Sequence, residues 1–385
     1  MTERLYDADS YASVFEATVL SCKKDRENRY AAVLDRTLFF PEQGGQYADK
    51  GTLNGQAVLD VQIVGGEIVH YIEKPFSEGE LVRGAIDFAE RFRRMQNHTG
   101  EHVLSGLVFR RYGYRNVGFH LGDEVTVDYD REFSPEQADE IERAANEVVY
   151  KNLPVLARYL TPEEKETLVY RSKKEIEGPV RVVSIPDCDD CACCAPHVRS
   201  TGEIGVIKIV SRIRYKGGTR LTVLCGSDAL ADYQKKSRLL AETAQLFSTK
   251  QERLPEAVSQ LFLENAELKK ERVRLHKALL DRILEGWKVQ KGAVDVFLVD
   301  AVLGEDALRQ LGTGWLERTN RTTLLVLEKE EGECSFALLG TADVRPLTAR
   351  LCEALGGKGG GKPEMTRGRI PASFEKIQKT VRQLL

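Results

Sequence analysis

Runs of β-favouring residues dominate the first 86 positions of the chain. Val58–Val64 and Glu67–Ile72 are two such runs, and Gly65-Gly66 separates them with the spacing of a tight β-hairpin. A glycine-rich segment, Phe39–Gln46, precedes this hairpin. The pattern therefore predicts a small β-barrel or sandwich over residues 1–86, with the glycine-rich segment as a loop.

Helical and strand patterns alternate over residues 87–226. We expect a helix over about Phe88–Arg111, followed by a strand-like stretch over Val117–Tyr129. Capping boxes that begin at Ser134 and Thr161, each with proline next, predict the starts of two more helices. A strand and a second Gly-Gly hairpin are expected over Val180–Ile185, Val206–Tyr215 and Thr219–Leu224. This mixture predicts an α+β domain.

Residues 227–290 have the composition of a helical linker. They are rich in Leu, Glu, Lys, Arg and Ala, and leucine recurs every seven residues at Leu261, Leu268 and Leu275. Arg272 interrupts a strict heptad pattern. The linker is therefore a coiled coil, formed within the chain or with a second copy, or else a helical spacer.

Residues 291–385 begin a new α/β unit. Two strands and an intervening helix are expected over Val294–Val299, Thr322–Leu327 and Asp306–Gln310. A loop over Gly356–Pro363 and a closing helix from about Ala372 follow. The whole chain is thus predicted to be an α+β multidomain protein, divided at about residues 86, 226 and 290.

The composition predicts a cytoplasmic protein. At 385 residues, with 42% hydrophobic and 30% charged residues, the chain has room for about two to four domains. No apolar run approaches the roughly 18 residues of a membrane-spanning helix, and Met1–Arg4 does not resemble a signal peptide. Eight cysteines in such a chain favour a reducing compartment. The net charge of −3 argues against a protein that coats nucleic acid wholesale, although local basic surfaces remain compatible with it.

Two short motifs carry the candidate chemistry. His98 and His102 lie four apart in His-Thr-Gly-Glu-His, so they share one face of the predicted helix. Cys193 and His197 have the same spacing in Cys-Cys-Ala-Pro-His, after a predicted strand. Imidazole and thiolate suit zinc, so the four residues predict a Zn²⁺ site. Four ligands would close a tetrahedral site, whereas three would leave a position open for water or substrate.

Three neighbouring cysteines complicate this assignment. Cys188 and Cys191 resemble half of a zinc ribbon, but a second Cys-x₂-Cys pair is missing. Cys194 adjoins Cys193, yet only Cys193 has the Cys-x₃-His spacing. We therefore expect Cys193 to be the ligand, with the other three as buried thiols or alternate ligands.

At these residues the chain resembles the stand-alone alanyl-tRNA editing proteins in their long form. Asn97–Gly106 is similar to their histidine motif, and the four candidate ligands match those of the alanyl-tRNA synthetase editing domain. Phe40–Gln46 resembles the glycine-rich motif beside the editing pocket. Gly356–Met365 resembles the glycine-rich signature of the synthetase C-terminal domain, which is shared with DHH-type phosphoesterases.

The resemblance implies a zinc-dependent trans-editing hydrolase. Its substrate would be tRNA for alanine mischarged with serine or glycine, and the bond hydrolysed would be the ester at the 3′ end. Zinc would anchor the aminoacyl end or activate water. Thr99 and Gln46 would contact the substrate, beside Gly44 and Gly45 of the glycine-rich motif. The C-terminal region would bind tRNA and support a homodimer.

Discrimination between serine and alanine sets a physical requirement. A pocket that admits serine cannot exclude the smaller alanine by size, so it needs a group that hydrogen-bonds the seryl hydroxyl. Thr99 is the predicted group. The chain also departs from the usual Cys-Gly-Gly-Thr-His motif at Cys194, Ala195 and Pro196, which stiffens the turn and removes a hydroxyl.

Two basic stretches are candidate RNA contacts. Five basic residues and no acid lie between Gly205 and Cys225, and residues 345–385 hold nine basic residues against three acidic ones. Such surfaces bind phosphates, although alternating Lys and Arg on a strand also simply face water. The predicted contacts are Lys208, Arg212, Arg214, Lys216, Arg220, Lys358 and Lys362.

Two other functions fit parts of the sequence. A zinc-stabilised RNA-binding module without hydrolytic activity would have the same motifs, but Cys193→Ala would then unfold it. His98–His102 also matches the His-x-x-Glu-His pattern of a metalloprotease, with Glu101 as general base and Glu177 as third ligand. The protease reading leaves Cys193 and the last 160 or so residues without a role.

Overall fold

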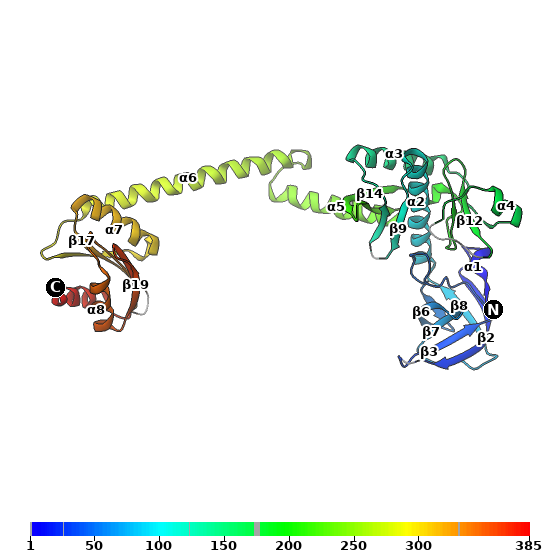
Figure 1. Ribbon diagram of the computed structural model, residues 1–385, viewed down its shortest axis with the longest axis horizontal. Helices are drawn as coiled ribbons and strands as arrows, with labels where there is room; N and C mark the ends of the chain where they lie inside the picture. Colours follow the sequence, from blue (N-terminus) through cyan, green and yellow to red (C-terminus); the bar gives the residue numbers. More distant parts are fainter. Residues whose placement is uncertain (1, 26, 123, 173–177, 330–331) are drawn as a thin grey trace. The chain divides into compact units, whose positions relative to one another are not determined.

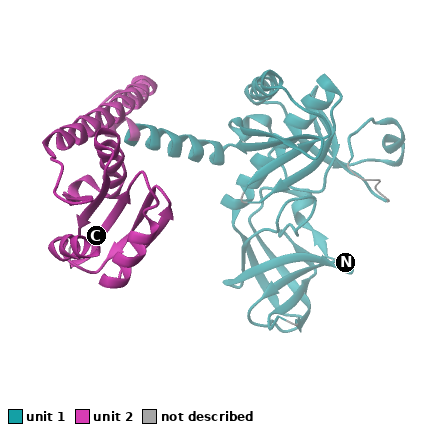
Figure 2. Ribbon diagram, turned by 60° about the vertical axis from the view of Figure 1, so that its left-hand side comes forward, with its two compact units in different colours: residues 1–242 teal, residues 243–385 magenta. Residues whose placement is uncertain are grey.

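The computed structural model describes the chain except for residues 1, 26, 123, 173–177 and 330–331. The described residues form two compact units, 1–242 and 243–385 (Figure 2). None of their helices has both the length and the apolar character that a membrane span requires. The mixed α+β, multidomain character predicted from the sequence is confirmed, whereas the predicted boundaries at about 86, 226 and 290 stay predictions.

Six strands of the first unit pair into a closed barrel in the order β2-β3-β7-β6-β5-β8 (Figure 1). The predicted hairpin is present, because β6 and β7 pair antiparallel across Gly65-Gly66, where both glycines have positive φ. Phe39 and Val61 are fully buried in the barrel core. The strands span Val14–Lys24, Tyr30–Leu34, Gly51–Leu53, Gln56–Val64, Glu67–Ile72 and Leu81–Ile86, for β2, β3, β5, β6, β7 and β8.

Two short strands and a short helix accompany the barrel, and helix α2 follows it. Strands β1 (Glu3–Arg4) and β4 (Arg36–Thr37) pair in parallel, with helix α1 (Leu5–Ala8) after β1. Helix α2 spans Phe88–Tyr112, close to its predicted bounds. Asp87 caps its start, and Gly113 ends it in the left-handed conformation.

Two further sheets and helices α3 and α4 follow α2 in the first unit, and α3 packs against α2. The sheets have the orders β14-β15-β10-β9 and β11-β12-β13. Both predicted capping boxes are present, at the starts of α3 (Pro135–Lys151) and α4 (Pro162–Thr167). The strands span Asn116–Leu121, Val125–Tyr129, Leu156–Tyr159, Arg181–Ile185, Asp189–Ala192, Ile207–Tyr215 and Gly218–Cys225, for β9 to β15.

The strand-like stretch predicted over Val117–Tyr129 consists of two paired strands. Val125 of β10 lies opposite Leu121 of β9. Gly122 and Glu124 interrupt the apolar pattern where the chain reverses. The second Gly-Gly hairpin, β14–β15, follows the prediction.

The second unit contains a five-stranded sheet of order β16-β17-β18-β20-β19. Helix α7 packs on one face of this sheet, and α8 and α9 pack on the other. Helix α5 (Ser227–Leu246) spans the boundary between the two units, and helix α6 (Leu254–Gly286) precedes the sheet in the sequence. The remaining elements span Val294–Val299, Glu305–Thr319, Thr322–Glu328, Cys334–Leu339, Arg345–Leu355, Lys358–Lys362, Met365–Ile370 and Phe374–Leu384, for β16, α7, β17, β18, α8, β19, β20 and α9.

The glycine-rich segment near the C-terminus is a strand rather than the predicted loop. Gly359 of β19 lies opposite Gly368 of β20, and a Cβ atom at Gly359 would come within 2.7 Å of the Phe336 ring. Glycine is therefore needed for close packing at this position. On α6, the predicted stripe of Leu261 and Leu268 is exposed.

A buried ion pair attaches the barrel to helix α2. Arg91 is fully buried, and its Nε donates to Asp49 Oδ1 at 3.0 Å. The same guanidinium donates to the Leu38 carbonyl at 2.7 Å, and Asp49 accepts from the Phe40 N–H at 2.7 Å. The pair therefore holds the segment that enters the glycine-rich loop against the first turns of α2.

We predict that Asp49→Ala lowers the free energy of unfolding by about 3–5 kcal/mol, because it leaves the Arg91 charge buried without its partner. Urea denaturation of the purified chain measures this change. Glu132→Ala is the control, because its pair with Arg214 is exposed and should contribute at most about 1 kcal/mol. A similar small loss for both variants would contradict the prediction.

Candidate metal centre

The candidate ligands come from a buried stretch of α2 and from the segment after β13. His98, Thr99 and His102 lie where α2 is buried on all sides, so their side chains are shielded from bulk water. Cys193 and His197 lie beyond the end of β13. Arg181, on the neighbouring strand β12, donates from Nη1 to the carbonyls of Cys193 and Ala195 at 3.0 and 2.9 Å, which fixes this segment.

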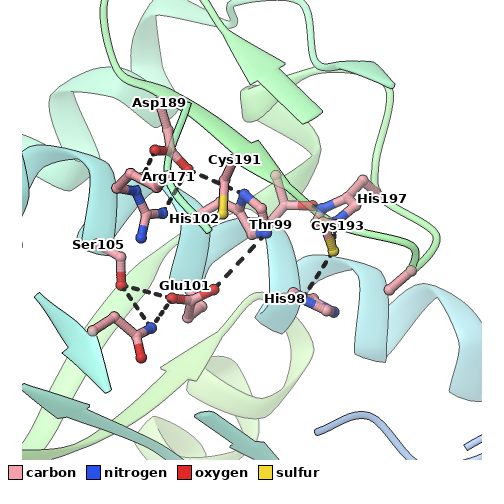
Figure 3. A network of polar contacts seen from close by, with 12 residues as sticks. His98, Thr99, Glu101, His102, Ser105, Arg171, Asp189, Cys191, Cys193 and His197 are labelled. Atoms are coloured by element: carbon pink, nitrogen blue, oxygen red, sulfur yellow. Dashed lines mark hydrogen bonds and ion pairs between the residues drawn. The ribbon is translucent and has the colours of Figure 1, made fainter. Parts of the chain in front are cut away.

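The four predicted ligands meet at one point. One donor atom from each of His98, His102, Cys193 and His197 lies within 4.8 Å of the others. Cys193 Sγ is 3.6 Å from His98 Nε2 and 3.3 Å from His197 Nε2 (Figure 3). Metal–ligand bonds of about 2.3 Å to sulfur and 2.0 Å to nitrogen at tetrahedral angles would place such atoms about 3.5 Å apart. The donor set therefore fits zinc in both chemistry and spacing.

The outer nitrogens of two histidines face atoms that only accept hydrogen bonds. His98 Nδ1 lies 2.9 Å from Gln46 Oε1, and His102 Nδ1 lies 3.1 Å from Asp189 Oδ2. An amide oxygen and a carboxylate both require the proton to be on Nδ1, which leaves the lone pair on Nε2. Nε2 is the atom of each ring that is available to a metal.

Thr99 contacts His197, the third histidine of the centre, at its outer nitrogen, Nδ1. Its Oγ1 lies 3.0 Å from His197 Nδ1 and accepts from the Val198 N–H at 3.3 Å. Thr99 is fully buried. The two predicted substrate contacts, Thr99 and Gln46, thus hold the outer nitrogens of predicted ligands in this structure.

Asp189 and Arg171 complete the support of His102, and the sequence prediction missed both. Arg171 donates to the two oxygens of Asp189 at 2.6 and 2.7 Å. Burial would raise the pKa of Asp189, but hydrogen bonds from Arg171 and His102 outweigh burial and lower it. The carboxylate therefore stays ionised and attracts the Nδ1 proton of His102. Asp189 could have been suspected from its position four residues before Cys193, but no local signal pointed to Arg171.

Burial governs the protonation of the other two ligands. It raises the pKa of the Cys193 thiol, and nearby Cys194 raises it further. It lowers the pKa of His197 well below the ordinary value, helped by the charges that His102 and His98 would carry. Without a cation, this site thus favours a neutral Cys193 thiol and a neutral His197 imidazole. A divalent ion would supply the positive charge that a thiolate needs here.

The glycine-rich loop places Gln46 at the centre. Gly44 and Gly45 both have positive φ, and they form a tight turn between Gln43 and Gln46. A Cβ atom at Gly45 would come within 2.3 Å of the Phe119 carbonyl oxygen on β9. Because only glycine fits there, the loop can lie directly on β9. The role of these glycines in the structure is to position Gln46.

The other cysteines near the centre differ in their surroundings. Cys191 is buried and forms a second group with His102 and Asp189, whose donor atoms lie within 4.8 Å of one another. The guanidinium of Arg171 already neutralises Asp189 in that group, which makes it a poorer cation site than the first. Cys188 is a buried thiol whose pKa is raised by burial, and Cys194 is only partly buried.

A cavity of about 670 Å³ lies beside the centre. Asp189, Cys191 and Asn116 form part of its wall, and Arg171 and Tyr170 also line it. Asp189 contacts His102 directly, so a single side chain lies between the cavity and this predicted ligand. The cavity is large enough to hold a small organic group, and the wall that contains Asp189 separates it from the four predicted ligands, none of which lines it.

Glu101 lies beside His102 but is held by neighbours. Its Oε1 accepts from Ser105 Oγ at 2.6 Å and from the Asn116 side chain, and its Oε2 is 3.9 Å from His102 Nε2. Glu177, the third ligand in the protease interpretation, lies outside the described residues. The first metal group uses Cys193 and His197, which that interpretation leaves without a role.

Several predicted RNA contacts on β14 and β15 have partners within the protein. Lys208, Arg214 and Arg220 form ion pairs with Glu142, Glu132 and Asp128, respectively. Arg212 donates to the Phe133 carbonyl, and Lys216 lies over the Tyr215 ring. This hairpin is therefore less cationic than its sequence indicates. Lys358 and Lys362 are exposed on β19.

Sequence comparisons relate the chain to aminoacyl-tRNA synthetases. Residues 180–222 match the family model described as the threonyl and alanyl tRNA synthetase second additional domain. Residues 6–90 match the model described as tRNA synthetases class II (A). The barrel region and the segment that carries Cys193 and His197 are thus of a class found in these synthetases.

Curated relatives specify which synthetase. Alanine–tRNA ligase from Pyrococcus abyssi is 36% identical over 96% of this chain and 42% of its own length. The enzyme from Pyrococcus furiosus is 34% identical over 100% of this chain and 43% of its own length. The chain is therefore a relative of alanyl-tRNA synthetase, as its motifs predict, and it spans less than half the length of these relatives.

A comparison of structures also returned the C-Ala domain from Aquifex aeolicus alanyl-tRNA synthetase. It covers 26% of this chain and 96% of that domain, with 18% identity and a TM-score of 0.23. A score this low supports no argument about the fold. The relationship therefore rests on the sequence matches.

We predict that Thr99→Val lowers the affinity for Zn²⁺ by about 10–100-fold, because His197 loses the hydroxyl that orients it. Competition with a chromogenic chelator measures the affinity. Thr201→Val is the matched control, since Thr201 is equally buried and bonds the Val148 carbonyl, away from the centre. Equal affinities for wild type and Thr99→Val would refute the assignment.

Proposed function

We propose that this protein is a zinc-dependent aminoacyl-tRNA deacylase that removes serine, or glycine, from mischarged tRNA for alanine. The observation that carries the proposal is the convergence of His98, His102, Cys193 and His197 in a chain related to alanyl-tRNA synthetase. These four residues would hold the ion. When bound, zinc would supply a Lewis acid for ester hydrolysis.

The reaction needs few groups from the protein. Water adds to the ester carbonyl, the bond to the ribose oxygen breaks, and that oxygen gains a proton as the amino acid leaves. His98 and Thr99 are buried away from bulk water, where fixed hydrogen bonds act strongly.

Gln46 is the residue we assign to the recognition of serine. Its side chain is fully buried, and its Oε1 is occupied by His98, whereas its Nε2 has no hydrogen-bond partner among the described residues. A buried N–H donor without a partner costs about 1–3 kcal/mol, and a substrate oxygen would remove that cost. The hydroxyl of a seryl group can provide the oxygen, and alanine cannot. Gln46 therefore takes the role that the sequence assigned to Thr99.

We predict that Gln46→Glu lowers the ratio of seryl to alanyl hydrolysis by at least about tenfold. Glutamate keeps an oxygen for His98 Nδ1 but removes the N–H donor. Rates of deacylation of the two esters, together with the zinc content of the variant, measure the effect. An unchanged ratio in a zinc-loaded variant would exclude Gln46 from this role.

The proposal is tested directly with purified protein and seryl- or alanyl-tRNA for alanine. We expect rapid loss of the seryl ester with wild type and loss of nearly all activity with Cys193→Ala or His197→Ala. Cys22→Ala is the control, because Cys22 lies on strand β2 of the barrel.

Circular dichroism of the same variants separates the alternatives. A folded but inactive Cys193→Ala variant supports a catalytic site, whereas an unfolded variant with an inactive wild type supports a zinc-stabilised RNA-binding module. Loss of activity in Glu101→Gln but not in Cys193→Ala would instead favour the protease. Folded, zinc-loaded wild type that leaves both esters intact would overturn the proposal.

A further inference from the structure

The cavity beside the candidate metal centre, about 670 Å³ in volume, is a separate space in the first unit. None of the four predicted ligands lines it, and neither does Gln46. Its wall comes from the end of α2 and from residues 115–117, 169–172 and 188–191. Sites for small molecules measure roughly 300–1,000 Å³, so the cavity has the size of such a site. The proposed deacylase makes no use of this space.

Arg171 presents hydrogen-bond donors in the wall of the cavity. Its Nε and Nη2 donate to Asp189 at 2.6 and 2.7 Å, whereas its Nη1 makes no hydrogen bond to any other described residue. One nitrogen of Arg171 is directed away from Asp189 (Figure 3). The side chain is only 15% exposed. A partly buried guanidinium edge with free N–H groups suits an oxyanion, which accepts two parallel hydrogen bonds.

Two further guanidinium groups line the cavity, from Arg110 and Arg115. Both residues are exposed, and neither guanidinium forms an ion pair or a hydrogen bond with another described residue. The acids in the wall are Asp189, which Arg171 already pairs, and Asp190. Three guanidinium groups therefore share the wall with two carboxylates. The surplus of positive charge favours an anionic ligand.

Apolar side chains form another part of the wall. Phe109, Val117 and Val169 line the cavity and are 42%, 62% and 89% exposed. Tyr170 adds a second aromatic ring. Aromatic side chains next to cations suit a ligand in which a flat ring is joined to a charged group, because the ring can stack while the cations hold the charge. A bare inorganic anion would leave these side chains without a contact.

We propose that this cavity binds a small phosphomonoester that carries a flat ring, of the kind found in a nucleoside monophosphate. A phosphomonoester has about 1.5–2 negative charges at pH 7, which suits several guanidinium groups better than the single charge of a carboxylate. Arg110, Arg115 and the free edge of Arg171 would hold the phosphate, and Phe109 and Tyr170 would contact the ring. This site does not depend on the proposed deacylase activity, because its wall excludes the four predicted ligands.

The test is isothermal titration calorimetry of the full chain with AMP and CMP, a purine and a pyrimidine monophosphate. We expect at least one of them to bind at least about tenfold more tightly than its nucleoside or inorganic phosphate, because each of these lacks part of the contacts. Absence of binding by both monophosphates would overturn the proposal. Equal binding of a monophosphate and its nucleoside would overturn it as well.

Substitution of the two exposed arginines locates the binding. Arg110→Gln, Arg115→Gln should weaken binding of the monophosphate by at least about tenfold, because two charge-assisted contacts are lost. The matched control is Arg111→Gln, Arg131→Gln, which removes two exposed guanidinium groups that do not line the cavity. Circular dichroism should show both double variants folded, since all four positions are exposed. Equal affinities of the two double variants would overturn the assignment to this cavity.

The phosphomonoester could belong to a free nucleotide or to the 5′ end of an RNA. A tRNA transcript that displaces the bound monophosphate only while it keeps its 5′-monophosphate would identify the RNA end as the source. A transcript that displaces nothing, before or after phosphatase treatment, would identify a free nucleotide. Displacement by the transcript regardless of its terminal phosphate would overturn the phosphomonoester specificity.

Discussion

The buried pair between Arg91 and Asp49 is the constraint on which the candidate centre depends. It fixes the segment that enters the glycine-rich loop against the start of helix α2, while Arg94 donates to the Tyr47 carbonyl at the end of that loop. The loop can then place Gln46 against His98, one turn further along the same helix. A buried ion pair is stabilising only when its hydrogen bonds are well aligned. The barrel therefore has little freedom to move relative to α2.

Neighbouring side chains also fix the orientation of the three histidines among the predicted ligands. Each histidine has a different neighbour at Nδ1: an amide from the barrel, a carboxylate from β13, and a hydroxyl from α2 itself. These contacts lower the entropy that a metal ion would otherwise have to remove from the rings. Arg171 also lines the cavity beside the centre, so the same ion pair with Asp189 supports both the cavity wall and the orientation of His102.

Local signals in the sequence predicted local features well. The capping boxes at Ser134 and Thr161 and the hairpin at Gly65-Gly66 depend on residues a few positions apart, and all three are present. The two motifs of candidate ligands were equally easy to recognise in the sequence, because a spacing of four residues can bring the two side chains of a motif close together. The supports of the ligands were not predicted, since Asp189 and Arg171 meet His102 only in the folded chain.

The error over the C-terminal glycines has the same origin, because they indicate a flexible loop until Phe336 is seen beneath them. The contact of the Thr99 hydroxyl with His197 likewise depends on the fold, and the role of Thr99 as a substrate contact stays a prediction.

The origin of the three Nδ1 contacts has a consequence for folding. Gln46 belongs to the barrel, so a chain whose barrel has not yet docked on α2 leaves the His98 ring free to turn and to exchange its tautomer. A chain that has not formed β13 leaves His102 in the same condition. An ion at the proposed centre would therefore find the four predicted ligands in place only after separate parts of the first unit have assembled. Metal binding would then occur only in chains whose first unit has folded. A nascent or partly unfolded chain would remain catalytically inactive.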